Sequence, residues 1–543
     1  MRDDINNLPK LTLTLRQQCD FELIANGGFA PLSTFLGKKD YISVVKHMRL
    51  TDGQLWPIPV VLDIPDYQKL EVGEEVLLVD EYNMPLATMK VNEIYKLNKD
   101  SEAEHVYGSK SEEHFGVNYL LRHTHDRCIS GPLTNISLPE HHNFVEWRQS
   151  PKELKKKLRG MKNKYVVAFQ TRNPIHAAHL AMIEKASKDV GAHILIHPVV
   201  GQTKDGDISY ITRVKSYTAL FEKRLKGKAT LSLLPLAMRM AGPREALWHA
   251  LIRRNYGATH FIVGRDHAGP GKDKLGKQFY HPLAAQKLAK EYEKELKIQI
   301  LPFDEMVYVK SRKKYIPQDE VIPGEKILSI SGTQFRQLLM HNKSIPSWFA
   351  FPEVVKVLRA GLKREIRSGL VILFTGLPSS GKSTLARLLQ HKILEYTHRS
   401  VSLLDGDVVR QHISKGLGFN KEDRNENIKR IGFVASEIAK HGGVAICAAI
   451  APYRESRLIN RRLIGQYGKY IEVYVSTPLR ECVRRDIKGL YNSHRGKIVS
   501  QLTGKDDPYE VPLDPEIVID TTNKPSKVCI DFIWSRLKEL KVI

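Results

Sequence analysis

The chain has 543 residues, of which 42% are hydrophobic and 27% are charged, a composition typical of globular proteins that excludes a mainly disordered chain. Lys and Arg number 84 against 60 Asp and Glu, which gives a formal net charge of +24. The sequence has no apolar run of roughly 18 residues, so we expect no transmembrane helix, and its first residues lack the apolar core of a signal peptide. Length alone predicts about three or four domains.

The charge leaves the class of partner open. A strongly basic chain fits nucleic acid, an acidic membrane surface or small anionic substrates, and it also fits a lysine-rich solvated surface. The five cysteines lie far apart in the sequence, with no CxxC pair. We therefore expect neither a disulfide framework nor a cysteine zinc site, and a reducing cytoplasm fits best.

Residues 1 to about 150 read as short alternating runs broken by turn residues, such as 56–62 and 75–79. This pattern predicts a mainly β region with some helix, and it contains no catalytic constellation of its own. The basic segment that follows, 152–164, has helical spacing and is typical of a solvated linker helix.

Two α/β blocks come next. From Tyr165 to about Lys326 apolar runs alternate with helical patterns, which predicts a parallel α/β domain with strands at 165–169, 193–196 and 259–264. A second block begins near Ser368, after a small helical connector marked by prolines. Its predicted strands are 370–375, 401–404, 444–448, 471–475 and 517–519. We expect domains at 1–160, 161–325, 326–365 and 366–543.

The run QTRNPIHAAH at 170–179 directly follows a predicted strand. Asn173 as N-cap and Pro174 at the first helical position predict a helix that begins here. His176 and His179 are then neighbours at the positive end of the helix dipole, with a glutamine and an arginine in the loop above. These groups predict an anion pocket. The HExxH pattern of zinc proteases is absent, so we expect no zinc.

Three further runs extend this candidate site. GRDHAGPG at 264–271 follows a later strand, at the sheet edge where open α/β proteins bind ligands. AGPRE at 241–245 adds Arg244 on a predicted loop. SGTQFR at 331–336 has the form of a capping box, with Ser331 and Gln334, that opens a helix.

Taken together, the four runs resemble the ATP sulfurylase family, over about residues 1–340, and FAPLSTF at 29–35 and WPIP at 56–59 are also similar. The resemblance implies a PUA-like, β-rich N-terminal domain and a Rossmann-like α/β nucleotidyltransferase domain. It implies that Gln170, Arg172 and the backbone around Ala268 hold sulfate, and that Thr171, Asn173 and His267 orient the phosphates of ATP. It further implies that His176 and His179 stabilise the transition state and that Met306 and Val307 line the adenine slot. Gly264, Arg265 and Asp266 belong to the same implied substrate-binding loop.

Such residue types suit this chemistry. Sulfate is a dianion and a poor nucleophile, and it must approach the equally negative α-phosphate while pyrophosphate leaves. Fixed positive charge offsets that repulsion and stabilises the pentacoordinate transition state. The reaction requires no covalent nucleophile, and the sequence shows none.

The run GLPSSGKS at 376–383 fits GxxxxGK(S/T) and lies between a predicted strand and a predicted helix. In such a P-loop the backbone N–H groups hold phosphates, Lys382 reaches the β and γ groups, and Ser383 binds Mg²⁺. The predicted ATP-binding residues are Gly376, Leu377, Pro378, Ser379, Ser380, Gly381, Lys382, Ser383 and Thr384.

The runs after the P-loop resemble adenylylsulfate (APS) kinase, over residues 368–543: DGDVVR at 405–410, GFNKEDR at 418–424, NIKR at 427–430, PYR at 452–454 and KGLY at 488–491. The resemblance implies that Phe419 stacks on the adenine of APS, and that Asp405 or Asp407 assists Mg²⁺ and accepts the 3′-hydroxyl proton. It implies that the rest of APS is held by Arg410, Arg424, Asn427, Arg454 and Lys488.

The chain departs from the kinase pattern at three places. Ala451 stands where many relatives have a serine before Pro-Tyr-Arg, 378–380 contains less glycine than is common, and the predicted lid near 493–504 is shortened. These departures bear on lid geometry and rate rather than on nucleotide binding.

Together the runs predict a multidomain α/β enzyme that activates sulfate in two steps, first making APS and then 3′-phospho-APS (PAPS). The alternative is an active sulfurylase whose kinase-like domain only senses nucleotide, as in some fungal sulfurylases, although such a sensor should have a degraded P-loop. No nucleic-acid-binding module is recognisable, which disfavours a nucleic-acid-binding protein. We expect Mg²⁺ with ATP, a cytoplasmic homo-oligomer, and no nucleic-acid or membrane partner. The expected ligands are sulfate, ATP, pyrophosphate, APS and PAPS, all anions that the excess positive charge could steer.

Overall fold

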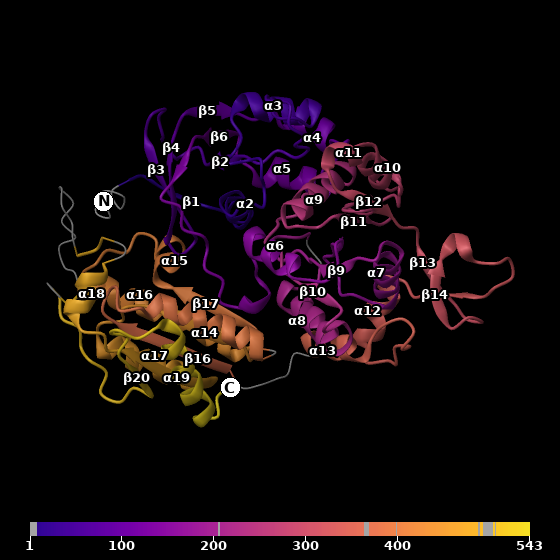
Figure 1. Cartoon of the computed structure of the whole chain (residues 1–543). Helices are drawn as coiled ribbons and strands as arrows, with labels where there is room; N and C mark the ends of the chain where they lie inside the picture. Colours follow the sequence, from indigo (N-terminus) through magenta and orange to yellow (C-terminus); the bar gives the residue numbers. More distant parts are fainter. Residues whose placement is uncertain are drawn as a thin grey trace.

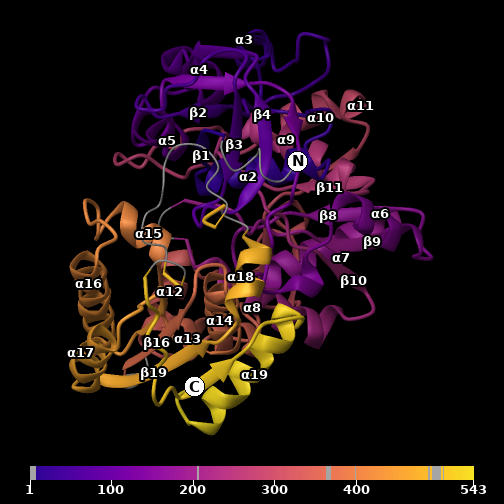
Figure 2. The same ribbon diagram turned by 90° about the vertical axis from the view of Figure 1, so that its left-hand side faces the viewer.

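The computed structural model describes residues 8–204, 207–362, 369–397, 399–486, 489–491, 503–504 and 507–543. Figures 1 and 2 show an N-terminal region in indigo, a middle α/β region in magenta, and a C-terminal α/β region in orange and yellow. In both views the C-terminal region lies below the N-terminal region and beside the middle one. No helix among the described residues is long and apolar enough to cross a membrane, and all five cysteines are buried and free.

From residue 8 onward the N-terminal region combines two small sheets, of strand order β1-β3-β4-β7 and β2-β6-β5, with four helices. Strands and helices both occur in this region, as predicted, although the helices are longer than a mainly β region implies, and the run 56–62 is not a strand. Its two prolines lack the N–H groups that a ladder needs, and pairing begins only at Leu62. The elements are β1 (Lys10–Thr12), α2 (Leu15–Ala25), α3 (Lys38–His47), β2 (Leu62–Ile64), β3 (Glu75–Val79), β4 (Pro85–Lys90), β5 (Glu93–Lys96), α4 (Lys99–Tyr107), α5 (Phe115–His123), β6 (Arg127–Ser130) and β7 (Leu133–Thr134).

Helix α5 has a titratable N-cap. The Nδ1 atom of fully buried His114 accepts hydrogen bonds from the N–H groups of Gly116 (3.1 Å) and Val117 (3.4 Å), while its Nε2 lies 2.8 Å from the hydroxyl of Tyr280. Burial lowers the pKa of His114 to about 4. The folded state therefore holds this ring neutral, and protonation would abolish the acceptor that caps the helix.

We expect the free energy of unfolding to fall as the pH drops from 6.5 towards 4. The unfolded chain, with an ordinary histidine pKa near 6.5, binds the proton that the folded chain excludes. The full effect is about 3 kcal/mol. Thermal unfolding of wild type and His114→Asn between pH 7 and 4.5 measures it, since asparagine also caps helices but does not titrate. Equal pH dependence of both proteins would contradict this assignment.

The middle region is built on a five-stranded parallel sheet of order β10-β9-β8-β11-β12. From the central β8 the chain runs outward to β9 and β10 and then returns to β11 on the other side. The order thus reverses between β8 and β11, where open α/β sheets form their ligand crevice. The elements are η1 (Val145–Trp147), α6 (Pro151–Arg159), β8 (Val166–Phe169), α7 (Ala177–Val190), β9 (His193–Ile196), α8 (Tyr210–Leu220), the π-helix η2 (Phe221–Leu225), β10 (Ala229–Leu231), α9 (Pro243–Asn255), β11 (His260–Val263), α10 (Ala284–Glu291), α11 (Glu293–Leu296) and β12 (Gln299–Pro302).

One apolar core joins the N-terminal and middle regions. Helix α9 is buried on nearly all sides, and its Trp248 ring packs against Phe29 at 5.0 Å and against Trp56 at 6.3 Å between ring centroids. Buried aromatic rings of this size bury large areas, so this contact fixes the N-terminal region against the middle sheet. The predicted basic helix is confirmed as α6, which also begins with a capping box at Ser150 and Glu153 that the sequence reasoning did not predict.

A small antiparallel sheet and two helices follow the middle sheet. Strands β14-β13-β15 form the projection at the right of Figure 1. The predicted capping box is confirmed, because Ser331 Oγ accepts from the N–H of Gln334 at the start of α12. Phe349, Phe351 and Val354 join the core of the middle region. The elements are β13 (Met306–Val309), β14 (Lys314–Pro317), η3 (Gln318–Glu320), β15 (Ile327–Leu328), α12 (Gly332–Met340) and α13 (Pro352–Leu362).

The C-terminal region is a second parallel sheet, of order β17-β18-β16-β19-β20, with helices on both faces. Leu370, Ile372 and Phe374 of β16 pack with α14 and α19, while Val371 and Leu373 face α16 and α17. The continuous apolar run of β16 follows from burial on both faces. The elements are β16 (Gly369–Gly376), α14 (Lys382–Tyr396), β17 (Val401–Asp405), α15 (Gly406–Gln411), α16 (Lys421–Lys440), β18 (Val444–Ala448), α17 (Arg454–Gly465), β19 (Gly468–Val475), α18 (Leu479–Arg485), β20 (Ile517–Ile519) and α19 (Ser526–Glu539).

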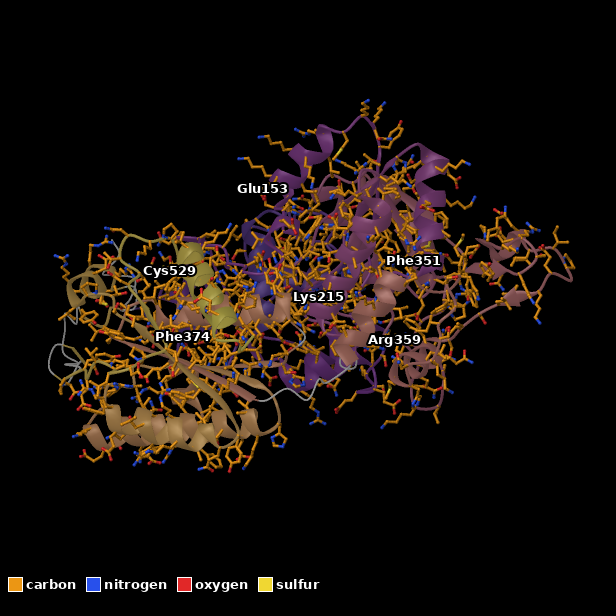
Figure 3. The ribbon with its side chains drawn as sticks, turned by 90° about the horizontal axis from the view of Figure 1, so that it is seen from below. Glu153, Lys215, Phe351, Arg359, Phe374 and Cys529 are labelled. Carbon is orange, nitrogen blue, oxygen red and sulfur yellow. The ribbon has the colours of Figure 1, made fainter. Side chains whose placement is uncertain are left out.

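Helix α14 carries the contact between the C-terminal and middle regions. The Lys215 ammonium donates to the carbonyl of Thr397 at 2.8 Å, and Asn143 Nδ2 lies 3.0 Å from His391 Nδ1. Figure 3 shows Lys215 between Phe374 of the C-terminal sheet and Phe351, the residue before α13.

Candidate active sites

The first candidate site lies at the carboxyl ends of β8 and β11. The predicted helix start at Asn173 is wrong: α7 begins at Ala177, with His176 as its N-cap residue. The hydroxyl of Thr171 instead accepts from the N–H of Asn173 and donates to its carbonyl, both at 3.0 Å. This local closure, together with Pro174, holds the segment as a turn before the helix.

The two histidines of this turn are stacked and held neutral. Their ring centroids are 3.8 Å apart, which confirms that the sequence spacing brings them together. Burial lowers the pKa of His176 to about 4 and holds the pKa of His179 well below its usual value. The Nδ1 atoms of both rings are buried and have no hydrogen-bond partner in the structure. Two neutral imidazoles with open ring nitrogens can donate hydrogen bonds to an anion without carrying charge.

Arg172 is held by a carboxylate. Its guanidinium lies 2.8 Å from Asp207, and both side chains are largely buried. Arg213 donates to the carbonyl of Arg172 at 2.8 Å and so fixes the backbone below it. Gln170 Nε2 points to the sulfur of Met238 at 3.7 Å. The sequence reasoning missed Asp207 and Arg213, although Asp207 and the basic residues around it follow the strand next to β8.

Lys204 is a further cation that the sequence reasoning missed. Its ammonium donates to the carbonyl of Pro270 in the 264–271 loop at 3.3 Å. Burial, then the neighbouring Arg172 and Arg336, lower the pKa of Lys204. The site therefore gathers Arg172 and Lys204 from two loops and Arg336 from α12, a concentration of positive charge that favours a bound anion.

The 264–271 loop has a left-handed backbone at two residues that are not glycine. Asp266 and Ala268 have φ near +50° and +54°, and the space beside Gly269 is filled by the Asp266 carboxylate. His267 Nε2 lies 3.0 Å from His249 Nδ1, and His249 Nε2 lies 3.3 Å from Glu245. Burial keeps the pKa of His267 well below its usual value. This relay positions the loop against α9.

Arg244 does not belong to this site. It lies on α9 rather than on a loop, and its guanidinium donates to the backbone carbonyls of Val44, Val45 and Pro57. The predicted adenine residues Met306 and Val307 begin β13, next to Glu305, whose carboxylate lies 3.6 Å from Arg265. That ion pair brings the start of β13 to the 264–271 loop.

The second candidate site is the P-loop at the end of β16. Gly381 (φ +102°) precedes α14, and Lys382 begins it. The Lys382 ammonium donates to the carbonyl of Leu377 at 2.6 Å, inside the loop. Ser379 has φ +58°, a left-handed conformation that costs roughly 1 kcal/mol for a residue with a Cβ. The departure from glycine at this position is thus tolerated with the loop shape kept.

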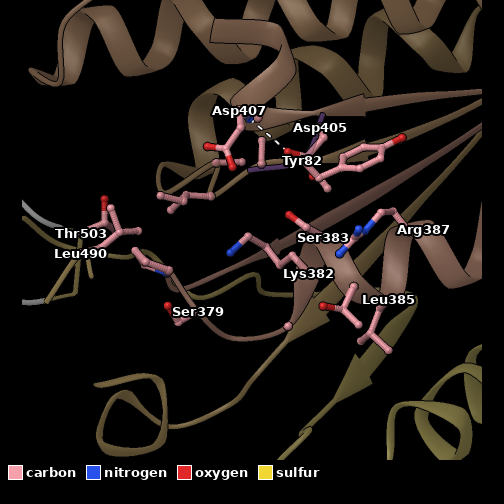
Figure 4. Close-up of a pocket in the computed structure, with 18 of the residues that line it drawn as sticks. Tyr82, Ser379, Lys382, Ser383, Leu385, Arg387, Asp405, Asp407, Leu490 and Thr503 are labelled. Atoms are coloured by element: carbon pink, nitrogen blue, oxygen red, sulfur yellow. Dashed lines mark hydrogen bonds between the residues drawn. The ribbon is translucent and has the colours of Figure 1, made fainter. Parts of the chain in front are cut away.

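Two carboxylates face the P-loop. Asp405 ends β17 and caps α15, since its Oδ1 accepts from the N–H of Asp407 at 3.1 Å. The side chain is 1% exposed, and its Oδ2 has no hydrogen-bond partner in the structure. Figure 4 shows Asp405 and Asp407 across the cavity from Lys382 and Ser383. A buried, unsatisfied carboxylate oxygen beside a serine hydroxyl fits Mg²⁺, which prefers oxygen ligands.

Most of the predicted APS residues line the same cavity as the P-loop. The Arg410 guanidinium lies 4.2 Å from the ring centroid of Phe419, and Arg424 donates to the carbonyl of Phe419 at 2.6 Å and to the Thr503 hydroxyl at 2.6 Å. Asn427 is buried with its Oδ1 unsatisfied. Phe419 remains 47% exposed, so its ring has a free face for stacking.

A cavity of about 460 Å³ joins the P-loop, the two aspartates and this wall, a size typical of ligand pockets. Its lining also includes Arg485, Thr521 and Lys524, which the sequence reasoning missed. Arg454 is not part of the lining; its Nε donates to the carbonyl of Val511 at 2.9 Å. Lys488 and most of the predicted lid lie outside the described residues.

Comparison with known proteins matches three family models along the chain. They are a PUA-like domain at 1–138, ATP-sulfurylase at 145–361 and adenylylsulphate kinase at 368–520. A sulfate adenylyltransferase from Mycosarcoma maydis is 44% identical over 532 residues, covering 96% of this chain and 93% of the relative. The chain belongs to the sulfate adenylyltransferase family.

The sulfate adenylyltransferase of Gibberella zeae is 46% identical over 522 residues, covering 95% of this chain and 91% of that one. A solved structure described as a hexameric APS kinase from Thiobacillus denitrificans shares 31% identity, covers 99% of this chain and 95% of its own, and has a TM-score of 0.56. The predicted fold class is confirmed: a PUA-like domain, a sulfurylase domain and a P-loop kinase domain stand in one sulfate adenylyltransferase chain.

Proposed function

We propose that this chain activates sulfate in two consecutive reactions. The sulfurylase domain joins sulfate to the α-phosphate of ATP, giving APS and pyrophosphate. The kinase domain transfers the γ-phosphate of a second ATP to the 3′-hydroxyl of APS, giving PAPS and ADP. Consuming APS in the second step drains the unfavourable first equilibrium.

For the sulfurylase step we assign sulfate to Arg172, Gln170 and the backbone near Ala268. Sulfate replaces the Asp207 carboxylate as the partner of Arg172, an exchange of one anion for another. A sulfate oxygen attacks the α-phosphorus, and the bond to pyrophosphate breaks. Neutral His176 and His179 donate hydrogen bonds to the oxygens that gain charge, as preorganised donors do in a dry site. Thr171, Asn173 and His267 orient the phosphates, and Met306 and Val307 line the adenine slot.

For the kinase step the observation that carries the proposal is the intact P-loop facing a buried, unsatisfied Asp405. Lys382 holds the β and γ phosphates, and Arg410, Phe419, Arg424 and Asn427 hold APS. Ser383 with Asp405 or Asp407 would hold Mg²⁺, which neutralises phosphate charge when bound. The other aspartate accepts the proton of the attacking 3′-hydroxyl.

Two assays on the purified chain test both steps. We expect sulfate-dependent exchange between ATP and pyrophosphate, and formation of PAPS from supplied APS, ATP and Mg²⁺. Exchange without any PAPS would favour the alternative, a kinase-like domain that only senses nucleotide. We further propose a cytoplasmic homo-oligomer; the hexamer described for the Thiobacillus denitrificans protein supports an oligomer.

Charge steering gives a prediction of its own. The net charge of +24 attracts anionic substrates through a field that salt screens, with a Debye length that falls from about 30 Å at 0.01 M to about 10 Å at 0.1 M. We expect kcat/KM for sulfate and for APS to fall several-fold over this range. Steady-state kinetics in KCl, with a neutral osmolyte as control, measures it. An unchanged kcat/KM would mean that the excess charge has no steering role.

A further inference from the structure

A turn of the N-terminal domain reaches the kinase cavity. Residues Asp80 to Met84 connect β3 to β4, and Asp80 closes the turn by accepting from the N–H groups of Tyr82 and Met84, both at 2.8 Å. Asn83 completes it with φ +62°. Contacts within the turn therefore set its shape, without any help from the kinase domain.

This turn docks on the P-loop helix. The Asp80 carboxylate lies 3.3 Å from the guanidinium of Arg387 on α14, and the two side chains are 16% and 13% exposed. The same guanidinium lies 4.8 Å from the ring centroid of Tyr82. One arginine thus ties both an acidic and an aromatic residue of the turn to the helix that begins with Lys382.

Tyr82 and Met84 belong to the lining of the kinase cavity. Tyr82 lies close enough to Asp405 for that carboxylate to contribute to the raised pKa of its phenol, after burial and Glu81. Figure 4 shows Tyr82 beside Asp405 and Arg387, on the side of Lys382 away from Leu490 and Thr503. The N-terminal domain therefore supplies part of the cavity wall beside Asp405.

We propose that the Asp80–Met84 turn is part of the acceptor site of the kinase, so that binding of APS depends on the docked N-terminal domain. Tyr82 and Met84 exclude water beside Asp405, and a drier site strengthens the attraction between its cations and the anionic acceptor. Asp80 acts through Arg387 as a positioning residue. This inference rests on the proposed kinase function.

The test measures KM for APS and for ATP in PAPS formation by full-length Tyr82→Ala. We expect KM for APS to rise about tenfold, the scale of one lost aromatic contact, with KM for ATP within twofold of wild type. Tyr82→Phe keeps the wall and should restore the wild-type value. Tyr67→Ala is the control in the same domain, because Tyr67 is 83% exposed. Sulfurylase exchange by each variant checks the fold.

Other outcomes overturn the inference in distinct ways. A KM for APS within twofold of wild type in Tyr82→Ala would show that the turn does not contribute to APS binding. Equal rises for both substrates would indicate a general loss of kinase structure, and a lower KM would mean that the turn obstructs the site. Absence of PAPS from the wild type contradicts the proposed kinase function itself and removes this inference with it, whereas an active wild type with unaffected variants contradicts the inference alone.

Discussion

Lys382→Ala should lower kcat/KM for PAPS formation by about 10²–10³-fold, the usual cost of one charged or oriented donor to a transition state. Lys382 is 8% exposed, and its ammonium donates to the Leu377 carbonyl inside the loop that would hold the phosphates. Sulfate-dependent exchange should be unchanged, because Lys382 belongs to a separate site. Coupled assays for PAPS and for exchange measure both rates on one preparation.

A matched control lies on the same helix. Lys392 of α14 pairs with Asp531 near the surface, and such pairs contribute about 0–1 kcal/mol. Lys392→Ala should therefore leave both activities close to wild type. PAPS formation that is indistinguishable between Lys382→Ala and wild type would refute the kinase site.

Arg172→Ala should have the opposite selectivity. We expect kcat/KM for sulfate to fall by about 10²–10³-fold, since the substitution removes the one guanidinium of the turn and leaves the buried Asp207 carboxylate without its partner. PAPS formation from supplied APS should continue at the wild-type rate. Exchange between ATP and pyrophosphate, measured with and without sulfate, reports the loss.

Three further variants separate the causes. Arg172→Lys keeps the positive charge but loses the planar guanidinium that can make two parallel hydrogen bonds, and it should recover only part of the rate. Arg122→Ala removes an exposed arginine that pairs with Glu112 and should have no effect. Exchange that persists unchanged in Arg172→Ala or in His176→Ala would overturn the assignment of this site.

The local patterns predicted the scaffold well. Three strands, β9, β18 and β20, have the predicted bounds, because a continuous apolar run between turn residues is a strong signal for a buried parallel strand. The capping box at Ser331 and the P-loop turn are also local, and both were predicted from adjacent residues alone.

Two failures arise from side-chain hydrogen bonds that the apolar pattern does not encode, one of them local and the other between regions. The start of α7 moved to Ala177 because the Thr171 hydroxyl closes a turn on Asn173, a side-chain contact that competes with helix capping. Arg244 points to the N-terminal domain because three carbonyls from another region accept its hydrogen bonds.

Other site residues come from loops brought together only by the fold. Lys204 and Asp207 reach Arg172 across the sheet, and Tyr82 reaches the kinase cavity from another domain. No spacing in the sequence encodes these approaches. The motifs therefore predicted the chemistry of the two sites. The fold added Lys204 and Asp207 near Arg172 and placed Tyr82 in the lining of the kinase cavity.

The central claim is that one chain carries sulfate through both reactions. Incubation of the full-length protein with labelled sulfate, ATP and Mg²⁺, followed by separation of the labelled products, tests it most directly. The predicted result is label in PAPS, with Lys382→Ala accumulating only the small amount of APS that the first equilibrium allows. Label that stops at APS in the wild type, with the same product pattern in Lys382→Ala, would contradict it.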